Sequence, residues 1–140
     1  MTTRFLLDTN VLSEPSRRQP NPQVMARMRV HEHEVATAAP VWHELSYGVR
    51  RLPASRRRAA IERYLFQVVA RTMPILPYDQ AAAAWHATER ARLAAQGKPP
   101  PFVDGQIAAI AKTNDLVLVT ANTTDYVDFE DLSLVDWQTR

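Results

Sequence analysis

The sequence predicts an α/β protein in which a mostly parallel sheet of four to five strands is flanked by helices. Short apolar runs alternate along the chain with longer segments of helical periodicity, which favours parallel strands joined by right-handed crossovers. The run at 116–119 is apolar throughout, as in a strand that is covered on both faces. The chain has 140 residues, of which 46% are hydrophobic, and we expect residues 1–140 to form a single domain around one core.

The composition excludes several classes of protein. The chain contains no cysteine, which excludes disulfides, thiolate nucleophiles and cysteine-bound zinc. The four histidines show no metal-ligand spacing, so we expect them to be surface or packing residues. No apolar run approaches the roughly 18 residues of a membrane span, and the N-terminus lacks the apolar segment of a signal peptide. We therefore expect a cytoplasmic protein that does not enter a membrane.

The first predicted strand, 5–7, stops abruptly at Asp8. Residues 9–12 follow without glycine or proline and resume an apolar pattern, which predicts a strand, a tight turn and a helix. Asp8 then lies at the carboxyl end of a core strand, where ligands of open α/β sheets bind. Capping of the following helix by Asp8 or Thr9 is the alternative, because both residue types are common at helix starts.

The rest of the chain alternates helices with short strands. On the helices, we expect Val68 and Val103 to point into the core as members of apolar faces. Glu44 lies on the same helical face as Val41 and Leu45, where a carboxylate is costly unless it is paired or bound to a cation. The predicted helices cover 23–33, a segment that begins at Pro40, 56–71, 78–95 and 102–111, and the predicted strands cover 35–38, 75–76, 116–119 and, at a sheet edge, 132–135.

Polar residues at the ends of two strands predict a site. Asp8 and the turn after the last buried strand lie at the same edge of the sheet, and Asp104 begins the helix that leads into that strand. Asp8, Asp104 and either Asn122 or Asp125 can therefore converge, and Glu44 joins them from the helix after the second strand. Such carboxylates repel one another unless they share a hard cation such as Mg²⁺ or Mn²⁺, which prefers oxygen ligands. Asp104 also suits a helix first turn on electrostatic grounds alone.

Four segments carry a family resemblance. They are Leu-Leu-Asp-Thr-Asn-Val-Leu-Ser-Glu at the N-terminus, Val-Trp-His-Glu-Leu-Ser-Tyr-Gly-Val around Glu44, Phe-Val-Asp-Gly-Gln-Ile-Ala-Ala-Ile-Ala around Asp104, and Leu-Val-Thr-Ala-Asn-Thr-Thr-Asp-Tyr near the C-terminus. In this order and spacing they resemble the PIN-domain ribonucleases, specifically the VapC-type toxins of bacterial toxin–antitoxin pairs. The resemblance spans essentially the whole chain and implies one PIN domain, a three-layer sandwich.

The resemblance also implies roles for individual residues in metal-dependent hydrolysis of RNA. The family's metal-binding acids match Asp8, Glu44 and Asp104, which would hold Mg²⁺ or Mn²⁺. The fourth acidic position is divided between two residues: Asn122 stands where the family has the acid of a Thr-x-Asp motif, and Asp125 matches the family acid that often precedes an aromatic a few residues later. We therefore expect catalysis from Asp8, Glu44, Asp104 and Asp125. Hydrogen bonds to these acids or to the scissile phosphate would come from Thr9, Thr120 and Asn122.

Partners follow from the same resemblance. The implied substrate is RNA, toward which the arginines of the chain would attract the phosphate backbone. A VapB-type antitoxin would wrap the toxin and cover the site, and a homodimer would form through the helices from Glu44 and from Tyr78 onward.

Two other functions compete with the ribonuclease. An aspartyl phosphotransferase of the haloacid dehalogenase type would use Asp8 as its nucleophile, but such enzymes carry a second aspartate two positions later, where this chain has Asn10. A catalytically silent PIN-like module that binds an antitoxin or nucleic acid is the second alternative. The three intact acids argue against it.

Overall fold

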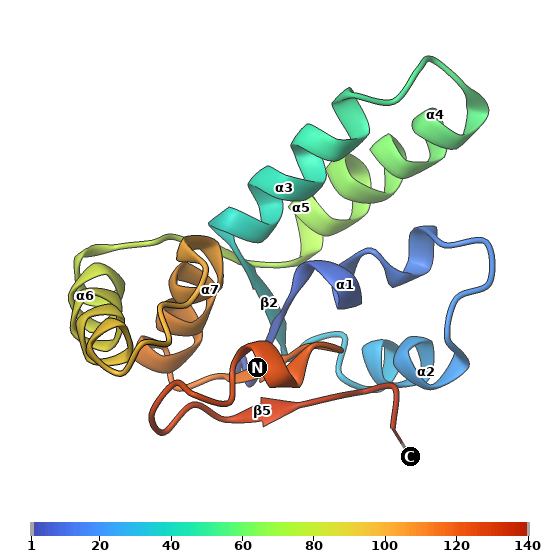
Figure 1. Cartoon of the computed structure of the whole chain (residues 1–140). Coiled ribbons are helices and arrows are strands. Elements are labelled where there is room, and N and C mark those ends of the chain that lie inside the picture. Colours follow the sequence, from blue (N-terminus) through green and yellow to red (C-terminus); the bar gives the residue numbers. More distant parts are fainter. Residues whose placement is uncertain (1, 140) are drawn as a thin grey trace.

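The described part of the chain, residues 2–139 of the computed structural model, is organised around a sheet of five strands (Figure 1). The strand order is β3-β2-β1-β4-β5, and every neighbouring pair is parallel. The predicted parallel sheet is therefore confirmed, with β3 and β5 at its edges. The strands are β1 (Phe5–Leu7), β2 (Val35–Ala38), β3 (Ile75–Leu76), β4 (Val117–Val119) and β5 (Leu134–Val135).

Helices cover both faces of this sheet. Figure 1 shows α6 and α7 as a pair on one side and α1 and α2 on the other, while α3 forms a hairpin with α4 and α5 that extends beyond the sheet. Within residues 2–139, no helix has the length and apolar character needed to cross a membrane. The helices are α1 (Thr9–Leu12), η1 (Glu14–Ser16), α2 (Pro22–Val30), α3 (Ala39–Arg50), α4 (Arg56–Arg63), η2 (Tyr64–Val69), α5 (Ala70–Thr72), α6 (Gln80–Ala95), α7 (Phe102–Thr113) and η3 (Thr123–Asp125).

The core lies between the central strands and the helices that cover them. Leu6, Leu7 and Leu118 have no exposed surface, because β1 and β4 have helices on both faces. Burial of each such leucine contributes about 1.5–3 kcal/mol relative to its exposed state. The register places Leu7 level with Val119. The residues that immediately follow β1 and β4 therefore emerge side by side at the carboxyl edge of the sheet.

The predicted helix 56–71 is interrupted by a π-helical stretch, η2. A π turn holds more residues than an α turn, so the side chains that follow are rotated around the axis. Leu65 and Val69 are buried, whereas Val68 is 50% exposed, and its predicted inward position is wrong. The Tyr64 hydroxyl at the start of η2 donates a 2.7 Å hydrogen bond to the Leu12 carbonyl, which ties the helical hairpin to α1.

Other predicted boundaries move by a few residues. The helix predicted over 23–33 ends at Val30, because the backbone turns there and His31 Nδ1 pairs with Glu34 Oε1 at 2.8 Å. The helix predicted from 78 begins at Gln80, since Asp79 caps it by accepting from the Ala82 amide. The last strand is shorter than its predicted range, 132–135.

The inward position predicted for Val103 is also wrong. This residue is 43% exposed. It lies in the first turn of α7, where it borders an open cavity beside Pro40 and Tyr78 instead of the core.

Candidate active site

Asp8 stands where β1 becomes α1 and serves both elements. Its amide donates to the Val119 carbonyl at 3.0 Å, which continues the pairing with β4. Its Oδ1 accepts from the Thr9 amide at 2.8 Å, so the carboxylate caps α1. Asp8 is only 6% exposed. The prediction that Asp8 caps the following helix is therefore correct for Oδ1, while Oδ2 is free of the cap and can accept from other groups.

Two hydroxyl groups donate to this second oxygen of Asp8. Thr120, the residue after β4, is fully buried, and its Oγ1 lies 2.9 Å from Asp8 Oδ2. The Tyr126 hydroxyl lies 3.2 Å from the same oxygen. Asn10 links the two turns because its Oδ1 accepts from the Ala121 amide at 2.9 Å. The Asp8 carboxylate is thus held in one orientation by groups from both strand ends.

Glu44 approaches the same edge from α3. Its Oε2 accepts a 3.0 Å hydrogen bond from Thr9 Oγ1, which positions the carboxylate next to the Asp8 turn. Glu44 lies on the predicted face, beside Leu45 and Gly48, but its side chain is exposed, so the carboxylate does not carry the cost of burial that the sequence suggests. Val41 and Val49 form the buried stripe of α3, and Glu44 lies at the border between it and solvent, where a carboxylate remains hydrated.

Asp104 lies in the first turn of α7 and is partly buried. Burial is the main cause that raises its pKa above the ordinary value, and the negative charges of Asp125 and Asp8 raise it further, with a smaller contribution from Glu44. A hydrogen bond from Tyr126 acts in the opposite direction. The carboxylates that the sequence places in four separate segments therefore lie close enough to influence one another.

The structure distinguishes the two candidates for the fourth acidic position. Asp125, in η3, raises the pKa of Asp104 by its charge. Asn122 is exposed, and its backbone amide donates to Thr120 Oγ1 at 3.1 Å. The chain thus brings Asp125 to the acids, whereas Asn122 supports the threonine that holds Asp8. The catalytic role of each residue stays a prediction.

The cluster has a large unbalanced negative charge. Within residues 2–139, none of Asp8, Glu44, Asp104 and Asp125 forms an ion pair with Lys, Arg or His. In the same described range, no three acidic or histidine side chains are arranged as a finished metal-binding group. The acids thus lie near one another, but their side chains are not arranged as a complete set of metal ligands.

Tyr126 is the site residue that the sequence did not single out. It is 2% exposed, and its hydroxyl interacts with both Asp8 and Asp104. Burial and the neighbouring carboxylates raise the pKa of this phenol far above its ordinary value, so the hydroxyl keeps its proton and acts as a donor. Its only signal in the sequence is its place directly after Asp125.

The histidines are surface or packing residues, as predicted. His31 packs against Phe5 and Trp137, with ring centroids 4.7 and 5.5 Å away. His86 is buried between α6 and α7 and lies 2.8 Å from the Tyr78 hydroxyl through Nδ1. His43 is exposed beside Glu44.

The fold and the acidic edge match a known class of protein. The PIN-domain family model matches residues 5–131, and the chain belongs to the PIN-domain family. Within the family, its relatives include VapC-type toxins. Toxin FitB of Neisseria gonorrhoeae is 36% identical over 125 residues, which are 87% of this chain and 90% of that protein. The tRNA(fMet)-specific endonuclease VapC of Shigella flexneri is 30% identical over 135 residues, 96% of this chain and 98% of the relative.

Solved structures agree with this assignment. The crystal structure of FitAcB from Neisseria gonorrhoeae superposes with a TM-score of 0.89 at 33% identity, covering 97% of this chain and 99% of the other. DNA-bound VapBC from Salmonella typhimurium gives a TM-score of 0.83 at 27% identity, covering 96% and 98%. The predicted PIN-like three-layer sandwich is therefore confirmed.

Proposed function

We propose that this chain is the toxin of a toxin–antitoxin pair, a metal-dependent endoribonuclease that hydrolyses RNA phosphodiester bonds in the cytoplasm. The observation that carries the proposal is the group of four carboxylates at the carboxyl edge of a parallel sheet, which have no cationic partner among residues 2–139. Ligands of open α/β folds bind at this edge. Relatives that are themselves named ribonucleases and endonucleases support the choice of reaction.

The residues present fit a hard divalent cation. All the side chains that converge are oxygen donors, the type that Mg²⁺ and Mn²⁺ prefer. Burial, together with the charges of Asp125 and Asp8, raises the pKa of Asp104, and a cation bound beside it would favour the ionised form. Asp8, Glu44 and Asp104 would hold the ion. When bound, it would lower the pKa of a water molecule and neutralise charge on the phosphate.

The protein groups have separate tasks in this mechanism. Thr120 and Tyr126 fix the Asp8 carboxylate by hydrogen bonds of 2.9 and 3.2 Å. Thr9 fixes Glu44, which faces solvent and is placed to orient the attacking water. Holding the water in line with the phosphate lowers the entropic cost of bringing the two reactants together.

A protein partner is part of the proposal. The structures of FitAB and VapBC are complexes, and we expect a VapB-type antitoxin to bind this chain and cover the acids. We also expect a homodimer through α3 and α6 with its neighbour α7. Tyr47, Phe102 and Val103 leave an apolar surface there, with exposures of 56%, 49% and 43%.

The aspartyl phosphotransferase receives no support from the structure. The place of its second aspartate is taken by Asn10, which accepts from the Ala121 amide and donates to Thr120 Oγ1 at 3.3 Å. Asn10 therefore ties two turns together through both polar atoms of its side chain. A catalytically silent binding module differs from the ribonuclease in the RNA-cleavage experiment, because it would fold but would not cleave.

Incubation of the purified protein with total cellular RNA tests the function. We expect discrete cleavage products with Mg²⁺ or Mn²⁺, and complete loss of cleavage with EDTA. Glu44→Gln should lower the rate on the order of a hundredfold, the usual cost of removing a group that stabilises charge in the transition state. Asp115→Asn is the matched control, because Asp115 is exposed and outside the cluster. Cleavage that persists in EDTA would refute the metal dependence, and a folded protein without cleavage would favour the silent module.

Thr120→Val tests the support of Asp8. The change removes the donor to Asp8 Oδ2 while it keeps the shape of the buried side chain. We expect metal affinity to fall roughly 10–100-fold, as when other outer partners of metal ligands are removed. Calorimetric titration with Mn²⁺ measures this loss. An affinity equal to that of the native protein would show that Tyr126 alone holds the carboxylate.

A further inference from the structure

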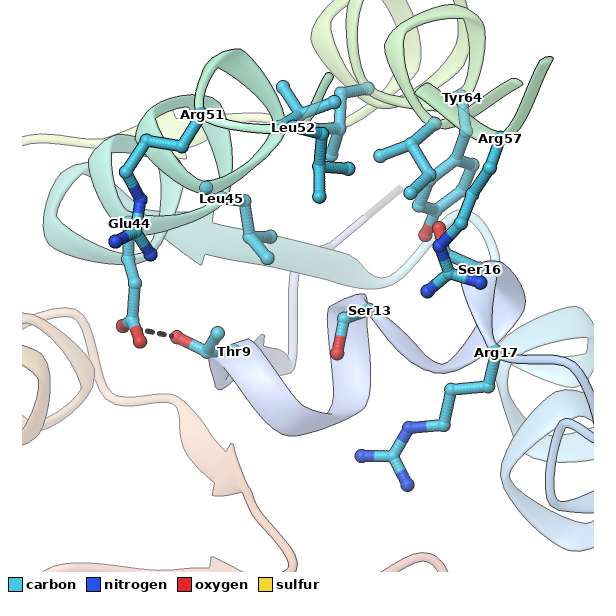
Figure 2. Close-up of a pocket in the computed structure, with 14 residues that line it drawn as sticks. Thr9, Ser13, Ser16, Arg17, Glu44, Leu45, Arg51, Leu52, Arg57 and Tyr64 are labelled. Atoms are coloured by element: carbon cyan, nitrogen blue, oxygen red, sulfur yellow. Dashed lines mark hydrogen bonds between the residues drawn. The ribbon is translucent and has the colours of Figure 1, made fainter. Parts of the chain in front are cut away.

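A cavity of about 370 Å³ opens directly beside Glu44 (Figure 2). One wall consists of α1 and η1, with Thr9 as its point of contact with the acids, and the other consists of the α3–α4 hairpin and η2. Figure 2 shows the Thr9–Glu44 hydrogen bond at one end of this space. The cavity is therefore continuous with the proposed active site, and its volume lies in the usual range for small-ligand pockets.

Two arginines on this cavity have no acidic partner in the described part of the chain. Arg51 and Arg57 both line it. Within residues 2–139 neither forms an ion pair, although Arg51 lies over the Tyr47 ring at 4.7 Å. In Figure 2 the Arg51 side chain extends toward Glu44, and Arg57 points into the space near Ser16. Positive charge therefore stands at both ends of a cavity that begins at an acidic cluster.

The neighbouring arginines, in contrast, are engaged by groups of the protein. Arg58 pairs with Glu62 at 2.9 Å and donates to the Leu52 carbonyl at 2.8 Å. Arg17, which also borders the cavity, pairs with Glu14 at 3.2 Å. These two arginines stabilise the protein itself, whereas Arg51 and Arg57 remain available to a ligand.

The floor of the cavity is apolar. Leu45, Leu52 and Ile61 line it, and Leu45 and Leu52 point into the space in Figure 2. Ser13 and Ser16 supply hydroxyl groups on the opposite wall. Gly48 lines the cavity as well, and a Cβ at this position would meet no atom within 4 Å. The space has room for a flat group that is apolar on its faces and polar at its edge.

We propose that this cavity binds the nucleotide next to the scissile bond, with its base on the apolar floor and the phosphates on its two sides at Arg51 and Arg57. The inference rests on the proposed ribonuclease function and adds a binding subsite to it. Guanidinium groups pair with phosphate in a bidentate manner, and a nucleobase has the mixed character that the floor and hydroxyl wall require. The ligand must reach from the acidic cluster into the cavity. An RNA strand cleaved at the acids would do so, because its next nucleotide is covalently attached to the scissile phosphate.

The arginines are tested by binding of RNA to the metal-free protein, in which cleavage does not intervene. The probe is a fluorescein-labelled single-stranded RNA decamer of random sequence, and the readout is anisotropy over a range of salt concentrations. The double variant Arg51→Gln/Arg57→Gln should bind roughly tenfold more weakly at low salt. The slope of log K against log salt should fall by about 1.4 for two lost phosphate contacts. Arg63→Gln/Arg71→Gln is the matched control, since both residues are exposed and lie outside this cavity.

The cavity itself is tested by filling it. Gly48→Leu adds a side chain at a position where a Cβ would meet no atom within 4 Å, and it replaces glycine by a better helix former. With Mn²⁺ present, KM for RNA should rise roughly tenfold while kcat changes little, because binding rather than chemistry is obstructed. Unfolding of the variant, followed by circular dichroism, identifies any loss that is merely structural.

The outcomes separate the inference from the function on which it rests. If the native protein cleaves RNA and the variants equal it in affinity, salt slope and KM, the subsite is overturned and the ribonuclease function stands. The same result with weakened antitoxin binding assigns the cavity to a protein partner and also overturns it. Native protein that neither binds nor cleaves RNA overturns the proposed function and the subsite together.

Discussion

Asp104→Asn should give a metal-free protein that is more stable than the native one and that cleaves RNA far more slowly when metal is added. Burial and the charges of Asp125 and Asp8 raise the pKa of Asp104, which means that its ionised form is disfavoured in the folded state. The neutral amide removes this cost. It also removes a proposed metal ligand, and we expect cleavage to fall on the order of a hundredfold or more.

The pH dependence of this effect has a definite sign. Because the pKa of Asp104 is higher in the folded than in the unfolded state, the folded protein binds its proton more tightly. The destabilisation is fully present above the raised pKa, and it is lost as pH falls from there toward the ordinary value of about 3.9. The stability advantage of Asp104→Asn should therefore be largest at neutral pH and disappear over this window.

Thermal unfolding in EDTA, repeated from pH 7 to pH 4, measures the advantage, and Asp115→Asn serves again as the control. Added Mn²⁺ should reverse the order, since the native protein binds the ion and gains stability by mass action. A variant less stable than the native protein at pH 7 without metal would show that the acids do not repel one another.

Of the three glycines, Gly105 should be the least tolerant of an added methyl group: Gly105→Ala should impair both stability and cleavage. Gly105 follows Asp104 on α7, and a Cβ there would overlap the His86 imidazole. This ring is 1% exposed, is held by Tyr78, and packs against Phe102 with a centroid distance of 4.9 Å. It has no room to move aside. The added methyl must therefore displace the first turn of α7, which carries Asp104.

We expect Gly105→Ala to lower the free energy of unfolding by about 1–3 kcal/mol, as overpacking usually does. Cleavage should fall roughly a hundredfold, because a displacement of an ångström is enough to misplace a catalytic group. Chemical denaturation and RNA cleavage measure the two effects. Gly48→Ala is the control for stability: its Cβ enters open space, so it should raise stability by up to ~1 kcal/mol through helix propensity.

The double variant His86→Ala/Gly105→Ala decides whether the overlap is the cause. Removal of the imidazole makes room for the methyl group, so the double variant should recover part of the cleavage lost in Gly105→Ala. Losses that simply add would contradict a direct contact. Native activity in Gly105→Ala would show that α6 and α7 can separate without moving the site.

The sequence was sufficient to predict the sheet and the edge at which the acids meet. The apolar runs, and the positions of Asp8 and Asp104 at the ends of elements, are determined by short segments of sequence and do not depend on tertiary contacts. The exposure of Val68 was not predictable, because it follows from a π turn that no residue type requires. The exposure of Glu44 was not predictable from its helical face either. A helical wheel gives the face of a residue but not how far the neighbouring elements extend over it.

The fourth position of the site shows a different limit. Asn122 and Asp125 both lie in one turn, and spacing cannot say which of them faces Asp104 until the 3₁₀ turn of η3 is formed. Tyr126 escaped notice because a tyrosine in an apolar sequence is usually a packing residue. Its contact with two carboxylates arises from tertiary structure alone.

The double duty of Asp8 has a consequence for how this protein can lose its activity. One oxygen of its carboxylate begins α1, while the other joins the turn after β4, so most substitutions there weaken the fold as well as the chemistry. Glu44 and Asp104 carry no such structural task. Spontaneous inactive mutants that escape a toxic enzyme yet still accumulate as folded protein should therefore arise at those two positions, and changes at Asp8 should be found mainly among mutants that are degraded.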